Sequence, residues 1–179
     1  PYTYLLSEGS SVSLYPVKIN DTIYDWYNPL NRVYSNLRLA LTKQNIRVKV
    51  SEYIGNENVI SSTSNGLLLF TKNKQQELTY KNEKIRALSL CKLNSDSLII
   101  ATAQDGILLY ANGIINEFIS PKKFAFNNVY MAKLFNRTLY VVTYNSFEVF
   151  DLNGKKMKQI TISVTPGSNH ISFPISDLA

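Results

Sequence analysis

Residues 97–110 read SLIIATAQDGILLY, and this stretch decides the fold. An apolar run (97–102) meets a polar turn that contains Asp105 and Gly106, and a second apolar run then ends at Tyr110. Two such runs joined by an Asp-Gly turn are typical of a β-hairpin, because glycine adopts positive φ without steric cost. The stretch therefore predicts two antiparallel strands.

The same hairpin recurs along the chain. The hexamers NGLLLF (65–70), DGILLY (105–110) and NSFEVF (145–150) start at intervals of 40 residues. Each follows another apolar stretch, at 58–64, 97–104 and 138–144. Further strand candidates lie ahead of each hairpin, at 46–53, 85–93 and 128–135, and behind it, at 71–80, 111–118 and 151–162. The repeat thus predicts four strands in a unit of about forty residues.

A four-stranded antiparallel unit repeated at this period is typical of a β-propeller blade, since each blade buries both faces against its neighbours. We therefore expect an all-β fold with blades at 46–84, 85–125 and 126–165. Residues 1–45, which include the strand candidates 11–19, 21–26 and 36–42, are expected to form a divergent or partial blade. Residues 166–179 are expected to start a further one. Because both end units are incomplete and the chain opens on Pro1, we expect an incomplete propeller, a fragment of a longer protein.

Residues 97–110 resemble the blades of two-component regulator propellers. Those blades typically read as an aliphatic strand, a small residue and Thr, a polar residue, Gly, and a second aliphatic strand. Residues 58–70 are similar, and residues 138–150 place Ser146 where Gly is typical. The resemblance implies the periplasmic sensor region of a Bacteroidetes hybrid two-component sensor histidine kinase, which recognises glycan fragments. It also implies a periplasmic or extracellular location, with the kinase outside this chain.

Residues 149–179 are also similar to the sorting tail of the type IX secretion system, which typically has a "YDLNGK" turn and an "ISDLASG" ending. A propeller protein associated with that system, or with another surface assembly, is therefore an alternative to the sensor.

The reactive side chains favour a non-catalytic role. His170 is the only histidine and lies beside a turn, while Cys91 is the only cysteine and lies in an apolar stretch. One His and one Cys do not provide the usual ligands of a zinc or iron site, and no motif for a cofactor is present. Most Asp residues fall in predicted turns, where they hydrogen-bond the backbone. The alternative is a propeller-fold glycan hydrolase or lyase, whose carboxylates can be distant in sequence.

Two sets of residues are candidates for ligand contact. Asp25, Trp26 and Tyr27 combine the only Trp with polar neighbours, and a sugar ring stacks on such an aromatic face while polar groups bind its hydroxyls. Tyr144 and Asn145 form a second set in the third hairpin turn. Packing between blades for the Trp, and a turn role for Tyr144 and Asn145, are the alternative interpretations.

The charge pattern limits the choice of partner. The chain has 19 Lys and Arg against 13 Asp and Glu, a formal charge of +6, but the basic residues are scattered and form no long run. This distribution disfavours nucleic acid and favours a solvating surface. No apolar run is as long as a membrane span. The expected partner is an oligosaccharide or a protein, and open blade edges predict self-association.

Overall fold

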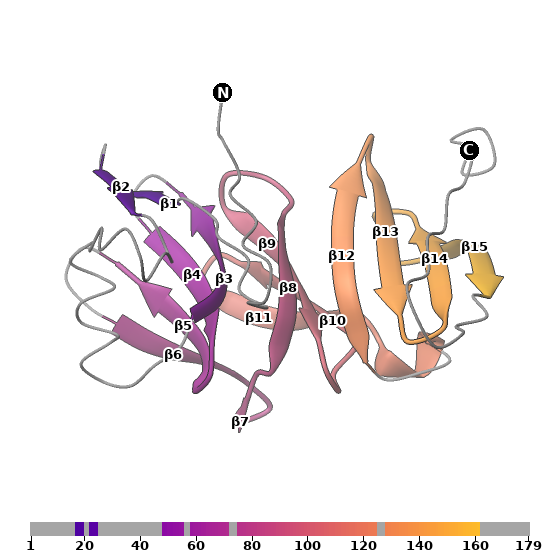
Figure 1. Cartoon of the computed structure of the whole chain (residues 1–179), viewed down its shortest axis with the longest axis horizontal. Coiled ribbons are helices and arrows are strands. Elements are labelled where there is room, and N and C mark those ends of the chain that lie inside the picture. The colour runs from indigo at the N-terminus through magenta and orange to yellow at the C-terminus, as the bar shows by residue number, and fades with distance from the viewer. Residues whose placement is uncertain are drawn as a thin grey trace, which may run out of the picture.

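The computed structural model describes residues 17–19, 22–24, 48–55, 58–71, 75–124 and 128–161. It contains three antiparallel sheets of four or five strands side by side, which confirms the prediction of an all-β fold consistent with part of a propeller (Figure 1). A short pair, β1 (Val17–Ile19) and β2 (Thr22–Tyr24), lies next to the first sheet. The predicted limits of the individual blades remain a prediction.

Each sheet follows the chain order of its strands. The first contains β3 (Val48–Ile54), β4 (Asn58–Thr63), β5 (Gly66–Phe70), β6 (Gln75–Tyr80) and β7 (Glu83–Lys84). The second contains β8 (Ala87–Lys92), β9 (Ser97–Thr102), β10 (Ile107–Ala111) and β11 (Ile114–Ile119). The third contains β12 (Val129–Phe135), β13 (Thr138–Thr143), β14 (Ser146–Phe150) and β15 (Lys156–Thr161). A short 3-10 helix, η1 (Pro121–Lys123), connects the last two sheets.

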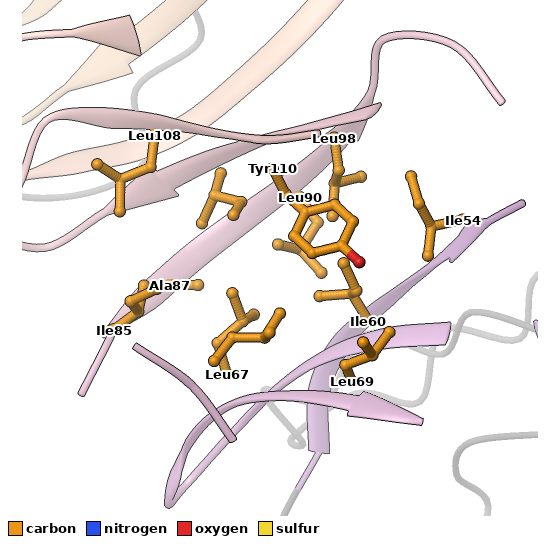
Figure 2. Close-up of a cluster of buried hydrophobic side chains, with 12 residues drawn as sticks. Ile54, Ile60, Leu67, Leu69, Ile85, Ala87, Leu90, Leu98, Leu108 and Tyr110 are labelled. Carbon is orange, nitrogen blue, oxygen red and sulfur yellow. The ribbon is translucent and has the colours of Figure 1, made fainter. Parts of the chain in front are cut away.

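The middle sheet is buried on both faces. On β9, Leu98 and Ile100 belong to a core shared with the first sheet, whereas Ile99 and Ala101 belong to a core shared with the third. Successive side chains of a strand point to opposite faces, so one apolar run supplies both cores. Figure 2 shows the first core, where side chains of both sheets meet around the ring of Tyr110. Burial on two faces is what packing between blades requires.

An equivalent side-chain hydrogen bond closes each of the three hairpins. In each, the hydroxyl of a threonine at the end of the second strand donates to the carbonyl oxygen of the residue that leads into the third strand. These pairs are Thr63 with Gly66 at 2.9 Å, Thr102 with Gly106 at 2.9 Å, and Thr143 with Ser146 at 3.4 Å. The bond satisfies a buried hydroxyl and closes the turn, so the repeated threonine has a structural role.

Three details differ from the simple repeat. The first sheet has a fifth strand, because Lys81 and Asn82 both adopt positive φ and form a tight turn that pairs β7 with β6. The second hairpin is longer than the other two, since β9 and β10 first pair at Ala101 and Ile107. In the third hairpin Ser146, expected to replace glycine at positive φ, does not have positive φ.

Residues that the sequence placed in the first and last units mostly lie outside the described residues. This applies to most of 1–45, to 166–179, and therefore to His170. Cys91, which lies in an apolar stretch of the sequence, is buried in the second core with 7% of its surface exposed. Burial raises the pKa of its thiol, and the hydrogen bond from the backbone N–H of Leu134 opposes that effect.

Candidate functional site

The first strands of the three sheets lie next to one another. In Figure 1, β8 runs between β3 and β12. The N–H of Gly55, at the end of β3, donates to the carbonyl of Ser95 at 2.6 Å, and the N–H of Leu134 on β12 donates to the Cys91 sulfur at 3.2 Å. These bonds fix the spacing of strands that are distant in sequence, and together the three form one surface.

This surface contains a pocket of about 170 Å³. Its apolar part comes from Val50 on β3 and from Leu90 on β8, which is buried. Tyr130 and Met131 on β12 also line it and are 45% and 43% exposed. An apolar base beside accessible aromatic and polar side chains is the usual composition of a ligand site, although ligand pockets are commonly larger, at about 300–1,000 Å³.

Leu88 and Ser89 on β8, and charged side chains from the other two strands, complete the lining. Lys49 and Glu52 come from β3 and Lys133 from β12. Burial raises the pKa of the Glu52 carboxyl, while the positive charges of Lys133 and then Lys92 act in the opposite direction. Glu52 is therefore in a partly dehydrated environment, within electrostatic range of two ammonium groups. Both signs of charge are thus available at one small pocket.

Of the two predicted ligand sets, only Tyr144 and Asn145 lie among the described residues. Asp25, Trp26 and Tyr27 lie outside the described residues. Tyr144 and Asn145 form the two-residue turn between β13 and β14, and Tyr144 is 62% exposed. Neither residue lines the pocket. Tyr144 is accessible for contact with a ligand, but it lies at a hairpin tip.

A buried polar network lies below that hairpin tip. The Ser146 hydroxyl is 2.6 Å from the Thr143 hydroxyl and donates to Oε1 of Glu148 at 2.8 Å. Glu148 is fully buried, and the Lys156 ammonium lies 2.5 Å from its Oε2. Glu148 pairs with Val141, a residue of the second core, so its carboxylate is on the face that packs against the β8–β11 sheet. The network fixes the base of the turn that carries Tyr144.

Sequence reasoning missed the pocket residues and Glu148. A signal existed for Glu148, because the corresponding positions of the other two hexamers hold Leu68 and Leu108. A charged residue at a position that is otherwise apolar and buried indicates a special local interaction. No comparable signal marked Lys49, Glu52 and Lys133, since nothing in the repeat indicates which residues of different strands share a pocket.

Within 48–161, apart from the gaps at 56–57, 72–74 and 125–127, no group of three or more His, Cys, Asp or Glu side chains could hold a metal ion. In the part of the chain that the structure describes, no helix has the length and apolar character needed to cross a membrane.

Comparison with known proteins identifies the fold through solved structures. No protein-family model matches the sequence, and no curated protein matches it. Two structures of the B. thetaiotaomicron BT4673 extracellular domain are similar. One is described as part of a one-component system (TM-score 0.56, 17% identity, 91% of this chain), the other as part of a hybrid two-component system (TM-score 0.55, 18% identity, 93% of this chain).

The chain spans only about a quarter of those extracellular domains, 23% and 24% of their length. At this level of identity the similarity shows the fold alone. It agrees with the fold implied by the resemblance of residues 97–110 to the blades of two-component regulator propellers. The chain therefore has the fold of part of an extracellular domain that is described as belonging to a signalling system.

Proposed function

We propose that this chain is a non-catalytic binding module in the extracytoplasmic sensor of a two-component signalling protein, and that it recognises a glycan fragment. The observation that carries the proposal is the pocket between β3, β8 and β12, which combines an apolar base, an accessible tyrosine and charged groups. Its formation depends on three consecutive sheets packed in order, which is the arrangement shared with the extracellular domains described above.

Location and domain organisation follow from the same proposal. We infer that the chain lies in the periplasm or outside the cell; both structural neighbours are described as extracellular domains, which supports this location. We also infer that the three sheets are consecutive blades with the limits 46–84, 85–125 and 126–165. The signalling part of such a protein would lie outside this chain.

Two exposed tyrosines mark two alternative places where the glycan could bind. Tyr130 lines the pocket and is 45% exposed, and an apolar ring with a polar hydroxyl suits a sugar. Tyr144 lies at the hairpin tip above the Glu148 network and does not line the pocket. Because both are exposed tyrosines, replacing each with Ala removes a similar surface from two different places.

The experiment is isothermal titration calorimetry of the 179-residue chain against a panel of plant and host oligosaccharides. We expect at least one to bind, and we expect Tyr130→Ala to weaken its binding about tenfold or more while Tyr144→Ala leaves affinity unchanged. Loss of binding in Tyr144→Ala or Trp26→Ala, with Tyr130→Ala unaffected, would assign binding to the sets predicted from sequence and reject the pocket. Absence of binding across the whole panel would reject glycan recognition.

A further inference from the structure

Three charged side chains line the pocket without a direct partner among the described residues. Among the described residues, Lys49, Glu52 and Lys133 form no hydrogen bond or ion pair, whereas Glu148 and Lys156 are held together. Glu52 is nevertheless only partly exposed and faces the pocket. Polar groups in partly buried positions are usually satisfied by a partner. A ligand that supplies an anionic group for the lysines and a hydrogen-bond donor for Glu52 would fit this lining.

The balance of charge favours an anion. Lys49 and Lys133 line the pocket and Lys92 is close enough to affect Glu52, against the single carboxylate of Glu52 itself. The positive potential at the pocket therefore attracts a negatively charged group, and an ammonium group binds a carboxylate or sulfate by a charge-assisted hydrogen bond. Glu52, which can only accept when ionised, suits a hydroxyl donor.

The size and shape of the pocket limit the ligand further. A volume of about 170 Å³ is well below that of a typical pocket for a drug-sized molecule, so it accommodates a single ring. Val50, Leu88 and Leu90 provide apolar lining suited to a ring face, and Tyr130 adds an exposed aromatic side chain. One ring with an apolar face, hydroxyls and one anionic group matches these features together.

We propose that this pocket binds an acidic sugar, with Lys133 and Lys49 donating to its carboxylate or sulfate and Glu52 accepting from its hydroxyls. This inference rests on the proposed function and adds the chemical class of the ligand. It distinguishes the roles of the charged side chains, because the lysines recognise the anion and Glu52 recognises the sugar. The two roles are separable by substitution.

The test compares four probes by calorimetry: digalacturonate, its dimethyl ester, neutral galactobiose, and a sulfated disaccharide. We expect digalacturonate to bind about tenfold more tightly than its ester, the difference expected for one hydrogen bond to a charged group. Lys133→Met should reduce this preference, and the double variant with Lys49→Met should remove it, while both leave binding of the neutral disaccharide unchanged. Lys155→Met, which removes a charge from an exposed turn, is the matched control and should retain the preference for digalacturonate over its ester.

The results distinguish a carboxylate from a sulfate as the anion, and they distinguish failure of the acidic-sugar inference from failure of the glycan-binding function. Tight binding of the sulfated disaccharide alone, sensitive to Lys133→Met, would assign the anion as sulfate; tight binding of digalacturonate would assign it as carboxylate. Glu52→Gln should weaken acidic and neutral sugars alike. If neutral and acidic probes bind equally, the acidic-sugar inference is wrong while the glycan-binding function stands. If no probe binds but other members of the oligosaccharide panel do, the inference is also wrong.

Discussion

The ion pair between Glu148 and Lys156 provides a quantitative test of how the third sheet is held. The carboxylate is fully buried; its Oε1 accepts a hydrogen bond from the Ser146 hydroxyl, and its Oε2 has the Lys156 ammonium as its ion-pair partner and no further hydrogen bond among the described residues. Replacing Lys156 with Met keeps most of the side-chain volume and removes only the cation. The buried carboxylate then remains with a single neutral hydrogen bond.

The cost follows from the burial of the two partners. Removing one member of a buried pair destabilises a protein by about 3–5 kcal/mol, because the remaining charge is uncompensated. The Lys156 side chain is 28% exposed, so water can approach the vacated position and we expect the lower end, about 3 kcal/mol. Glu148→Leu should behave differently. It introduces the residue found at positions 68 and 108, and the remaining Lys156 still reaches Oε1 of Gln159 at 2.9 Å.

We therefore expect an asymmetric result. Glu148→Leu should change the free energy of unfolding by less than about 1 kcal/mol, and the double variant with Lys156→Met should be no less stable than Glu148→Leu alone. Urea denaturation of the three variants and the parent chain measures this, with equal m-values showing that the extent of unfolding is unchanged. If Lys156→Met unfolds within 0.5 kcal/mol of the parent, as surface substitutions typically do, or if Glu148→Leu costs as much as Lys156→Met, the pair is not a buried, mutually dependent interaction.

Three further predictions concern other parts of the fold. Because the folded state holds the proton of Glu52 more tightly than the unfolded state, stability should fall as pH rises from the ordinary glutamate pKa to the raised one. The Glu52→Gln variant should thus have a higher melting temperature than the parent chain at pH 7, and the two melting temperatures should converge in acid. Gly106→Ala should lower stability by about 2–3 kcal/mol in urea, since φ is +67° and the new Cβ would collide with the Ile119 carbonyl. Phe147→Lys should reduce self-association in sedimentation velocity, because this half-buried ring lies on the face of the third sheet that points away from the second; an unchanged distribution would place the contact elsewhere.

The strands were predictable because their signal is local. Residues 97–102 and 107–111 are bounded by turn residues, and a continuous apolar run of this length suits a strand buried on both faces. The run does not indicate which core each side chain enters, since Leu98 and Ile99 are both aliphatic residues but belong to different cores. That assignment depends on the packing of the sheets.

The pocket was unpredictable for a related reason. Lys49, Leu90 and Lys133 are separated by about forty residues each, and only the contact of β3 and β12 with β8 brings them together. Periodicity predicts that the first strands of successive units are equivalent, but it gives no information on which of their side chains meet. Residue chemistry drew attention to Trp26 and Tyr144 instead, because aromatic residues beside polar ones can be recognised within a few positions of sequence.

The distribution of charge between strands favours the proposed binding site on the first strands of the three sheets. On β14 the carboxylate of Glu148 has a cation and a hydroxyl as partners, because it lies on the face that is buried against the second sheet. On β3 and β12, by contrast, Lys49 and Lys133 are exposed and need no partner within the protein. Substitutions there can alter ligand preference with little effect on stability, whereas a new charge on β9 or β14 requires compensation. Specificity can therefore change on the surface formed by β3, β8 and β12 while the cores between the sheets stay the same.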